Sequence, residues 1–243
     1  MKAMILAAGR GERMRPLTDH CPKSLLKVAG MPLIEYHVTK LAKIGVTDIV
    51  INLAWLGDSI VDYLQNGEKF GVNVHYSWET EGALETAGGI IRALPKLAEN
   101  NEPFLVVNGD IFIDYDFSSL PKLSEQQEGH LWLVDNPSHN LSGDFYLIDG
   151  VVQNKSPIEV NAAYDAKGST GAKKQCFTFS GIGLYRPSLF HNYLDKKVMA
   201  LAPVLKAAMD KQQISGELLT GLWTDVGTPE RLEQLNKNKQ GIS

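Results

Sequence analysis

A group of cations stands beside two glycines near the beginning of the sequence. Gly9 and Gly11 directly follow a short apolar run, and Arg13, Arg15 and Lys23 come soon after. Glycine adds backbone freedom and removes bulk. Free N–H groups and arginine forks match the oxygens of a phosphate. This combination is typical of a loop that holds phosphate after a buried strand.

The spacing excludes two well-known phosphate loops. A dinucleotide-binding loop needs G-x-G-x-x-G, and Met14 occupies the place of the third glycine. A Walker A loop needs Gly-Lys-Ser/Thr, which does not follow here. Glycine spacing alone is equally compatible with an ordinary strand-to-loop turn. The cations and Pro16 favour phosphate, because they concentrate charge on a stiffened loop.

Asp110 is the carboxylate best placed for metal chemistry. It ends the segment FLVVNGD, directly after a dense apolar run that predicts a buried strand. Mg²⁺ prefers carboxylate oxygens and usually takes only one or two of them from the protein. A solvated turn aspartate is the alternative interpretation, because Asp after Gly is common in loops.

Strands and helices alternate through the first half of the chain. The apolar patterns predict these elements in order: a strand at 4–7, a helix at 31–44, a strand at 48–54, a helix at 57–65, a strand at 72–78, a helix at 86–97 and a strand at 104–108. Such alternation predicts an α/β fold, a Rossmann-like, doubly wound mixed sheet that is mostly parallel. The glycine loop and Asp110 then lie at the same edge of the sheet.

The pattern changes near residue 135. We expect a strand at 130–134, a hairpin at 143–153 with its turn at Asp149-Gly150, and a strand at 176–185. Helices are expected at 188–194 and 203–211, followed by a short strand at 223–226 and a last helix from Thr228-Pro229 onward. Residues 154–174 are polar and predict a long exposed excursion. We interpret 1–243 as a single domain, with a nucleotide-binding half (1–135) and a sugar-phosphate-binding half (136–243).

Composition limits the classes of partner and the cellular location that we expect for the protein. The 243 residues are 44% hydrophobic and carry a net charge of −4, which argues against a nucleic-acid binder. Two cysteines far apart, Cys21 and Cys176, favour a reducing compartment. No segment reaches the length of a membrane span, and the first apolar run is too short for a secretion signal. We therefore expect a cytoplasmic protein.

The stretch LAAGRGERMRPLT, followed by Pro22-Lys23, resembles the signature of the sugar-1-phosphate nucleotidyltransferases, L-x-G-G-x-G-T-R-L-x-P-L-T with P-K after it. Ala8 replaces a glycine of that signature and Glu12 replaces the usual Thr or Ser. A carboxylate beside a triphosphate is electrostatically unfavourable. Glu12 is therefore expected to point away or to pair with a cation.

The resemblance implies a nucleoside triphosphate, a sugar 1-phosphate and Mg²⁺. It assigns Asp110 and Asp225, in WTDVGTPERL, to the metal. It places Arg15 against the leaving pyrophosphate and Lys23 against the reacting α-phosphate. Arg15, Lys23 and Asp110 are thus the expected catalytic residues.

The resemblance also implies the residues that bind each substrate. The nucleotide-binding set is Leu6, Ala7, Ala8, Gly9, Arg10, Gly11, Glu12, Lys23, Glu81, Glu85, Thr86, Gly88 and Asn108. The sugar-binding set is Asn108, Gly143, Asp144, Ser180 and Gly181. In LETAGG we expect Thr86 to cap a helix and the glycines to admit a flat base, with close helix packing as the alternative. The chain shows Phe-Ser-Gly where many members have Asn-x-Gly, and it lacks the E-K-P motif.

Whole segments are similar to one subgroup, the N-acetylmuramate-1-phosphate uridylyltransferases of peptidoglycan recycling. The segments include PLIEYH, IVINLAWLGDSI, LVDNPSH and FTFSGI, and Glu12 agrees with this subgroup. UTP is then the preferred nucleotide. Mannose-1-phosphate guanylyltransferases and glucose-1-phosphate uridylyl- or thymidylyltransferases are the rival subgroups. A non-catalytic sugar-nucleotide sensor is the alternative of another class. We expect a monomer or a weak homodimer.

Overall fold

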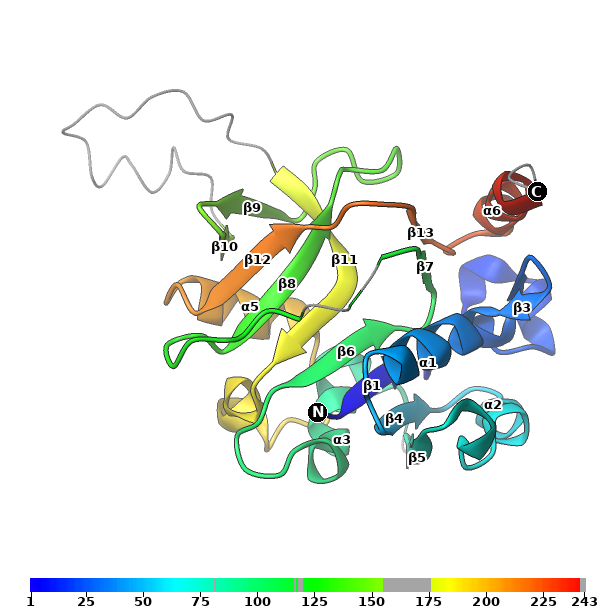
Figure 1. Cartoon of the computed structure of the whole chain (residues 1–243), viewed down its shortest axis with the longest axis horizontal. Coiled ribbons are helices and arrows are strands. Elements are labelled where there is room, and N and C mark those ends of the chain that lie inside the picture. The colour runs from blue at the N-terminus through cyan, green and yellow to red at the C-terminus, as the bar shows by residue number, and fades with distance from the viewer. Residues whose placement is uncertain (81, 116, 118–119, 155–175, 241–243) are drawn as a thin grey trace.

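The fold is organised around one large mixed sheet. The computed structural model describes residues 1–80, 82–115, 117, 120–154 and 176–240. In that part of the chain the sheet has nine strands, in the order β5-β4-β1-β6-β11-β8-β12-β10-β9 (Figure 1). The strands are β1 (Ala3–Leu6), β4 (Asp48–Leu53), β5 (Asn73–Trp78), β6 (Phe104–Asn108), β8 (Gly129–Val134), β9 (Phe145–Ile148), β10 (Val151–Gln153), β11 (Cys176–Tyr185) and β12 (Ile214–Leu218).

The first half forms the parallel part of this sheet. β5, β4, β1 and β6 run parallel, with Leu6 of β1 in register with Asn52 of β4 and Asn108 of β6. The residues of β1, β4 and β6 are almost continuously apolar, as expected for strands that are covered on both faces, whereas the edge strand β5 alternates between buried and more exposed residues. The carboxyl ends of β1 and β6 therefore lie side by side, which confirms the predicted meeting of the glycine loop with Asp110.

Helices cover both faces of the sheet. Their bounds are α1 (Leu33–Lys43), α2 (Gly57–Leu64), α3 (Glu85–Leu97), α5 (Leu201–Met209) and α6 (Pro229–Gln240). Ile5 of β1 packs into one core with α1 and α2, whereas its neighbour Met4 packs into a second core with α3 and α5. This alternation follows from the period of two along a strand. The doubly wound arrangement is confirmed.

The second half is mixed in direction. β11 runs antiparallel to both β6 and β8, while β12 runs parallel to β8. The hairpin formed by β9 and β10 is confirmed, with Asp149 and Gly150 at its turn. The parallel character of the sheet is thus concentrated in the first half of the chain.

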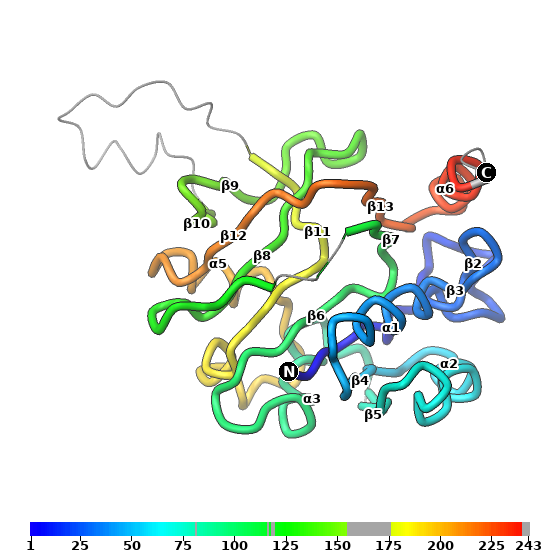
Figure 2. The backbone as a smooth tube through the Cα atoms, in the orientation of Figure 1, coloured from blue at the N-terminus to red at the C-terminus, as the bar shows by residue number. Residues whose placement is uncertain are grey.

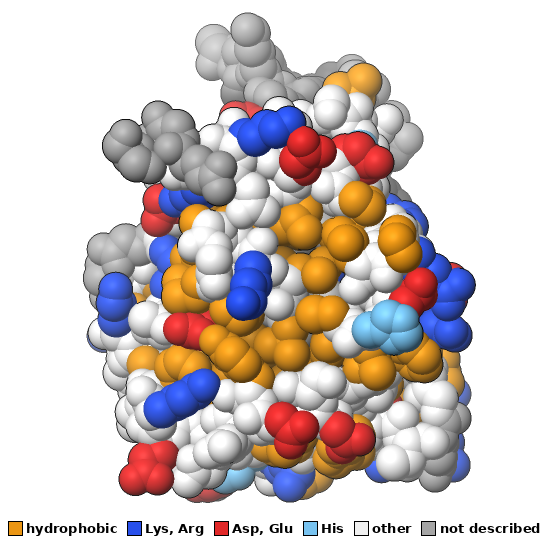
Figure 3. All heavy atoms as spheres, turned by 90° about the vertical axis from the view of Figure 1, so that its right-hand side faces the viewer, with side chains coloured by type: hydrophobic (Ala, Val, Ile, Leu, Met, Phe, Trp, Pro, Cys, Tyr) orange, Lys and Arg blue, Asp and Glu red, His pale blue; other side chains and the backbone are white. Residues whose placement is uncertain are grey.

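Two short strand pairs complete the fold. β2 (Lys27–Val28) pairs with β3 (Met31–Pro32), and β7 (Ile111–Ile113) pairs with β13 (Trp223–Asp225). Figure 2 shows β13 beside β7, although about half of the chain separates them. The face where α6 and the β2–β3 pair lie carries hydrophobic side chains across its middle (Figure 3). Patches of this kind often mark places where protein or ligand contacts form.

The structure corrects several predicted elements. Met31 lies in β3, so the first helix begins only at Leu33, and the predicted helix at 188–194 is a 3₁₀ turn at Pro187–Tyr193. β7 and β12 were not predicted. The polar stretch at 154–174 lies, except for Asn154, outside the described residues. No described helix is both long and apolar enough to span a membrane.

Candidate nucleotide-binding active site

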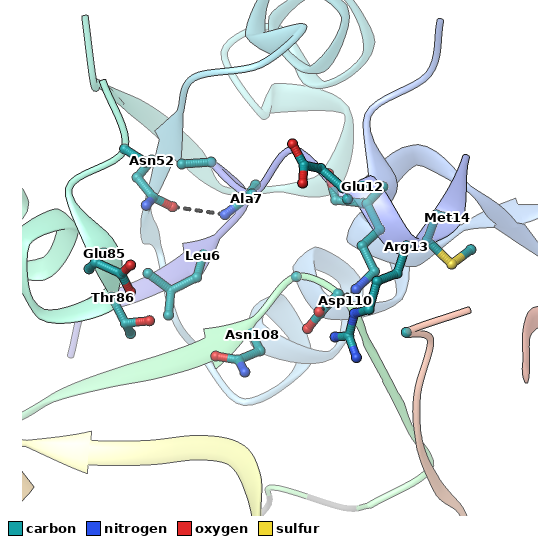
Figure 4. Close-up of a pocket in the computed structure, with 18 of the residues that line it drawn as sticks. Leu6, Ala7, Glu12, Arg13, Met14, Asn52, Glu85, Thr86, Asn108 and Asp110 are labelled. Atoms are coloured by element: carbon teal, nitrogen blue, oxygen red, sulfur yellow. Dashed lines mark hydrogen bonds and ion pairs between the residues drawn. The ribbon is translucent and has the colours of Figure 1, made fainter. Parts of the chain in front are cut away.

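A cavity of about 510 Å³ opens at the carboxyl edge of the parallel strands. Residues of the glycine loop and the ends of β1, β4 and β6 contribute to it, together with the start of α3 (Figure 4). Its lining residues are Leu6, Ala7, Ala8, Gly9, Gly11, Glu12, Arg13, Met14, Lys23, Ser24, Asn52, Glu79, Ala83, Glu85, Thr86, Asn108, Gly109, Asp110 and Gly227. Most of the predicted nucleotide-binding set is therefore brought together.

The glycine loop presents open backbone to this cavity. A Cβ added at Gly9 would meet nothing within 4 Å. Gly11 has a φ of +67°, and the hydroxyl of Thr18 donates to its carbonyl at 2.8 Å. Met14 is fully buried and anchors the far end of the loop. The loop is thus held from behind while its front faces the space that a ligand would fill.

Lys23 and Asp110 form an ion pair in the cavity. Lys23 Nζ lies 2.6 Å from Asp110 Oδ2, and the lysine side chain is only 12% exposed. Lys23 comes from a 3₁₀ turn and Asp110 from the turn after β6, so the pair joins segments 87 residues apart. A partly buried pair is screened less by salt than a surface pair. The arrangement keeps a cation ready beside a carboxylate.

The structure does not bring Arg15 to the cavity. Its side chain is 52% exposed and pairs with Asp19 at 3.1 Å. Arg13 lines the cavity instead, and Figure 4 shows its side chain running toward Asp110. The family signature contains the signal that could have found it. When its proline is placed on Pro16, its arginine falls on Arg13 and not on Arg15.

Arg10 and Glu12 are two further charged residues of the same loop. Arg10 stacks over the ring of Trp55, 4.5 Å from its centroid, and does not line the cavity. Glu12 does line the cavity, but its carboxylate points away from Asp110 (Figure 4). That Glu12 turns away from a bound triphosphate or pairs with a cation stays a prediction, because Glu12 lines the cavity.

A buried polar network forms part of the cavity wall and was not predicted. Asn52 accepts a hydrogen bond from Ala7 N and donates one to Glu79 Oε1, both at 2.8 Å. Glu79 Oε2 accepts a further bond from Leu84 N at 3.2 Å. Both side chains are buried and line the cavity. Their positions at the ends of β4 and β5 are the sequence signal, because polar residues there face the ligand edge.

The LETAGG segment differs in part from its predicted geometry. The helix begins at Glu85, one residue before the predicted cap Thr86, and no side chain caps it. Glu85 and Thr86 line the cavity, but Gly88 does not. A Cβ at Gly88 would lie 2.6 Å from the carbonyl oxygen of Lys197, so this glycine permits close packing and does not receive a base. Glu81 lies outside the described residues.

The predicted sugar-binding residues form a second group beside Asn108. Gly181 has a φ of +83° and packs directly on Asn108, which lines the cavity. Ser180 is fully buried, and its carbonyl accepts a hydrogen bond from Trp223 Nε1 at 2.8 Å. These two residues lie in the irregular stretch of β11, where the register with β8 shifts. They shape the wall next to Asn108 but do not line the cavity.

Gly143 and Asp144 serve the loop that precedes β9. Asp144 accepts hydrogen bonds from Phe179 N at 2.8 Å and from Asn140 at 3.1 Å, so both carboxylate oxygens have partners. Gly143 has a φ of +67° and packs against Asn136 and Cys176. Neither residue lines the nucleotide cavity.

Asp225 lies near Asp110 through the backbone. It pairs with Ile111 across β13 and β7, and Val226 N donates to the Asp110 carbonyl at 2.8 Å. Its Oδ2 accepts a hydrogen bond from Arg231 Nη1. Its Oδ1 is buried and forms no hydrogen bond with the described residues, and His139 Nε2 lies 3.0 Å from it.

The donor set suits a hard cation that also binds phosphate. No cluster of three or more His, Cys, Asp or Glu side chains occurs among the described residues. Mg²⁺ does not need one, because it takes one or two protein carboxylates and completes its shell with phosphates and water. The buried Asp225 Oδ1 forms no hydrogen bond among the described residues, and such an ion would satisfy it beside His139. The residues therefore fit a metal shared by Asp110 and Asp225.

Cys21 shows no sign of activation. Burial raises the pKa of its thiol, and the nearby Lys27 only partly offsets this. A raised pKa lowers the fraction of reactive thiolate. Burial therefore makes the loop cysteine less reactive at neutral pH than an ordinary thiol.

Comparison with known proteins places this geometry in a family. A nucleotidyl transferase family model matches residues 2–241. The N-acetylmuramate alpha-1-phosphate uridylyltransferase of Neisseria meningitidis is 52% identical over 96% of both chains. The mannose-1-phosphate guanyltransferase 2 of Candida glabrata is 31% identical, and this chain spans 62% of its length.

A solved structure of a UDP-glucose pyrophosphorylase complexed with UDP-glucose superposes with a TM-score of 0.74 over 100% of this chain and 99% of its own. At 18% identity this likeness speaks for the fold alone. The cavity, the glycine loop and the near full-length family match agree with one another. The chain belongs to the nucleotidyl transferase family and is an enzyme of its sugar-1-phosphate nucleotidyltransferase branch.

Proposed function

We propose that the protein condenses UTP with N-acetylmuramate α-1-phosphate to give UDP-N-acetylmuramate and pyrophosphate. The single observation that carries this choice is the 52% identity, over 96% of both chains, to the Neisseria enzyme of that name. The reaction returns a cell-wall sugar to the nucleotide-activated pool, so its place is in peptidoglycan recycling. The free cysteines Cys21 and Cys176 support a cytoplasmic location.

The proposed chemistry is a direct displacement at phosphorus. A phosphate oxygen of the sugar 1-phosphate forms a new bond to the α-phosphorus of UTP, while the bond to the pyrophosphate oxygen breaks on the opposite side. Phosphoryl chemistry of this kind depends mainly on positioning and charge stabilisation. No covalent enzyme intermediate is needed.

Cations and backbone amides of the cavity supply that stabilisation. Lys23 is placed to exchange its partner Asp110 for the α-phosphate, because its Nζ is the buried end of a flexible chain. Arg13 and the open amides near Gly9 are placed to hold the triphosphate. In this proposal Arg13 takes the role that the sequence assigned to Arg15.

Asp110 and Asp225 are proposed to hold Mg²⁺. When bound, the ion neutralises charge on the phosphate oxygens and fixes their geometry. Asn52 and Glu79 are proposed to fix the wall against which the base lies, since they hold Ala7 and Leu84 by their backbone amides. Asn108 and Gly181 are proposed to face the sugar, with the first half of the chain binding nucleotide and the second half binding sugar phosphate.

The test is a matrix of nucleotides and sugar 1-phosphates read by pyrophosphate release. UTP, GTP and dTTP are each paired with N-acetylmuramate, N-acetylglucosamine, mannose and glucose 1-phosphates. We expect the highest kcat/KM for UTP with N-acetylmuramate 1-phosphate. A higher value for GTP with mannose 1-phosphate would reassign the protein to the rival subgroup.

Two variants separate an enzyme from a non-catalytic sensor. Asp110→Asn and Asp225→Asn should each lower kcat by at least about 100-fold, as for loss of a group that stabilises transition-state charge. Asp62→Asn, on the exposed side of α2, is the matched control and should keep full activity. Equal activity of all three variants would remove both carboxylates from the mechanism.

A further inference from the structure

A second cavity of about 350 Å³ adjoins Asp225 on the side of α6. Its lining residues come from the loops after β8 and β12, from β13 and from α6. The labels β13 and α6 mark two of these elements in Figure 1. Its polar and charged lining residues are Asp135, Ser138, His139, Thr224, Asp225, Arg231, Gln234 and Asn238. Gly227, two residues after Asp225, lines the nucleotide cavity. One short segment therefore contributes to both cavities.

Arg231 offers an unused recognition edge in this cavity. Among the described residues, the hydrogen bonds of its guanidinium all involve Nη1, which contacts Asp225 and lies 3.1 Å from His139 Nε2. The Nε and Nη2 groups form the other edge, and two parallel N–H groups on one edge fit a carboxylate. The side chain is 20% exposed, so this edge is partly withdrawn from water.

Amides extend the same polar surface along α6. Gln234 and Asn238 follow Arg231 by three and seven residues and line the cavity with it. Residues with this spacing share one face of a helix. The Lys237–Glu233 pair, by contrast, is exposed to solvent, with side chains 71% and 66% exposed. One face of α6 is thus polar and turned to the cavity, although Leu235 on that face is buried.

The titratable residues that line the cavity are Asp135, His139, Asp225 and Arg231. Asp225 is already paired with Arg231 Nη1. Asp135 is exposed to water, where its repulsion is screened. His139 comes from the loop after β8, and its Nε2 lies 3.1 Å from Arg231 Nη1 and 3.0 Å from Asp225 Oδ1. A carboxylate on the Nε–Nη2 edge would therefore meet Arg231 away from the Nη1 contacts with Asp225 and His139.

We propose that this second cavity binds the carboxylate-bearing substituent of the acceptor sugar. The inference rests on the proposed function, because N-acetylmuramate differs from N-acetylglucosamine by a lactyl ether that ends in a carboxylate. Arg231 binds that carboxylate through Nε and Nη2, and Gln234 and Asn238 provide neighbouring amide contacts. The proposed metal ligand Asp225 lies between the reacting phosphates and this substituent. Arg231 is then the residue that selects an acidic sugar.

The test compares two acceptors that differ only in the lactyl group. kcat/KM with UTP is measured for N-acetylmuramate 1-phosphate and N-acetylglucosamine 1-phosphate, in the wild type and in Arg231→Gln. We expect the variant to lose at least about 30-fold more activity on the acidic acceptor, as for loss of charged hydrogen bonds. The loss should appear mainly in KM. Any disturbance of Asp225 affects both acceptors equally and cancels in the ratio.

Further variants separate the charge of Arg231 from its two-pronged geometry, and a binding measurement separates substrate binding from catalysis. Arg231→Lys keeps the charge but not the two-pronged edge, so it should show an intermediate ratio. Lys237→Gln removes a cation from the exposed side of α6 and should leave the ratio unchanged. Calorimetry with a non-hydrolysable UTP analogue present should show that Arg231→Gln weakens binding of the acidic acceptor only. Thermal melts check that each variant is folded.

Two results would overturn the inference in different ways. If the wild type releases no pyrophosphate from UTP and N-acetylmuramate 1-phosphate, the proposed function fails and the inference fails with it. If the wild type is active but Arg231→Gln lowers kcat/KM for both acceptors by the same factor, the proposed function stands. In that case the second cavity does not recognise the acid, and Arg231 only positions Asp225.

Discussion

At the scale of single residues, the site is defined by charges that neutralise each other before any substrate binds. Lys23 is paired with Asp110, and Arg231 with Asp225. A carboxylate alone in a partly buried site would be costly, because burial penalises an unpaired charge. Lys23 can exchange Asp110 for a substrate anion, whereas Arg231 can keep Asp225 on Nη1 and offer Nε and Nη2 to one. The pairs therefore prepare the site without leaving it strongly charged.

The two loop arginines provide a direct test of the cavity geometry. Arg13→Ala should lower kcat/KM for UTP by about 100-fold or more, because it removes a cation beside the triphosphate. Arg15→Ala removes a half-exposed partner of Asp19 and should change the rate by less than about threefold, in keeping with the small effect of surface pairs. Steady-state kinetics of the two variants decide between them. A larger loss in Arg15→Ala would support the original prediction from sequence.

At the scale of elements, the ends of β4 and β5 and the start of α3 act as one unit. The Asn52–Glu79 network ties these three elements to β1 through Ala7. Gly89 of α3 makes room for it: an added Cβ would lie 2.7 Å from Glu79 Oε1 and 2.9 Å from Asn52 Nδ2. The second glycine of LETAGG thus serves the cavity wall from behind.

Gly89→Ala tests how tightly this unit is packed. Alanine favours a helix over glycine by up to about 1 kcal/mol. The clash with the network should outweigh that gain, and we expect a net loss of about 1–2 kcal/mol in the free energy of unfolding. Urea denaturation measures the loss, and UTP affinity should fall in parallel. Gly9→Ala, where an added Cβ meets nothing within 4 Å, should keep wild-type stability. A Gly89→Ala protein more stable than the wild type would show that the network has space to move.

At the scale of the whole molecule, one sheet separates two apolar cores, and a third core lies under α6. His37 of α1 is buried, and it is close enough to Asp110 to feel the charge of that carboxylate. Burial lowers its pKa to about 4, while a backbone hydrogen bond at Ile111 and the charge of Asp110 oppose that shift. The folded protein therefore holds a neutral His37 at pH values where the unfolded chain would protonate it.

The pH dependence of stability follows from this difference. Above pH 6.5 both states hold a neutral His37, so there is no effect. As pH falls from 6.5 toward 4, His37 becomes protonated in the unfolded chain but stays neutral in the folded protein. The free energy of unfolding therefore decreases by about 2 kcal/mol at pH 5. Urea denaturation at pH 7 and pH 5 measures the decrease in the free energy of unfolding. This decrease should be smaller in His37→Gln than in the wild type. His20→Gln, at an exposed position, is the control and should match the wild type. Identical pH dependence in all three proteins would refute this role of His37.

The sequence by itself determined which segments meet at the ligand edge of the sheet. Alternating apolar strands and helices require parallel pairing with right-handed crossovers, so the glycine loop and Asp110 had to lie together. The stretch that resembles the family signature was sufficient to indicate the branch of enzymes. These features depend on local pattern and on chain direction, both of which can be predicted from residue order.

Only the tertiary structure decided where side chains point. Arg13 and Arg15 are two residues apart in one cationic loop, yet the buried Met14 between them sends one into the cavity and leaves the other outside. Asn52 and Glu79 come from the ends of different strands, and Arg231 meets Asp225 because α6 packs beside β13. Residue spacing can mark such positions, but the contacts themselves arise from packing between elements distant in sequence, which spacing does not specify.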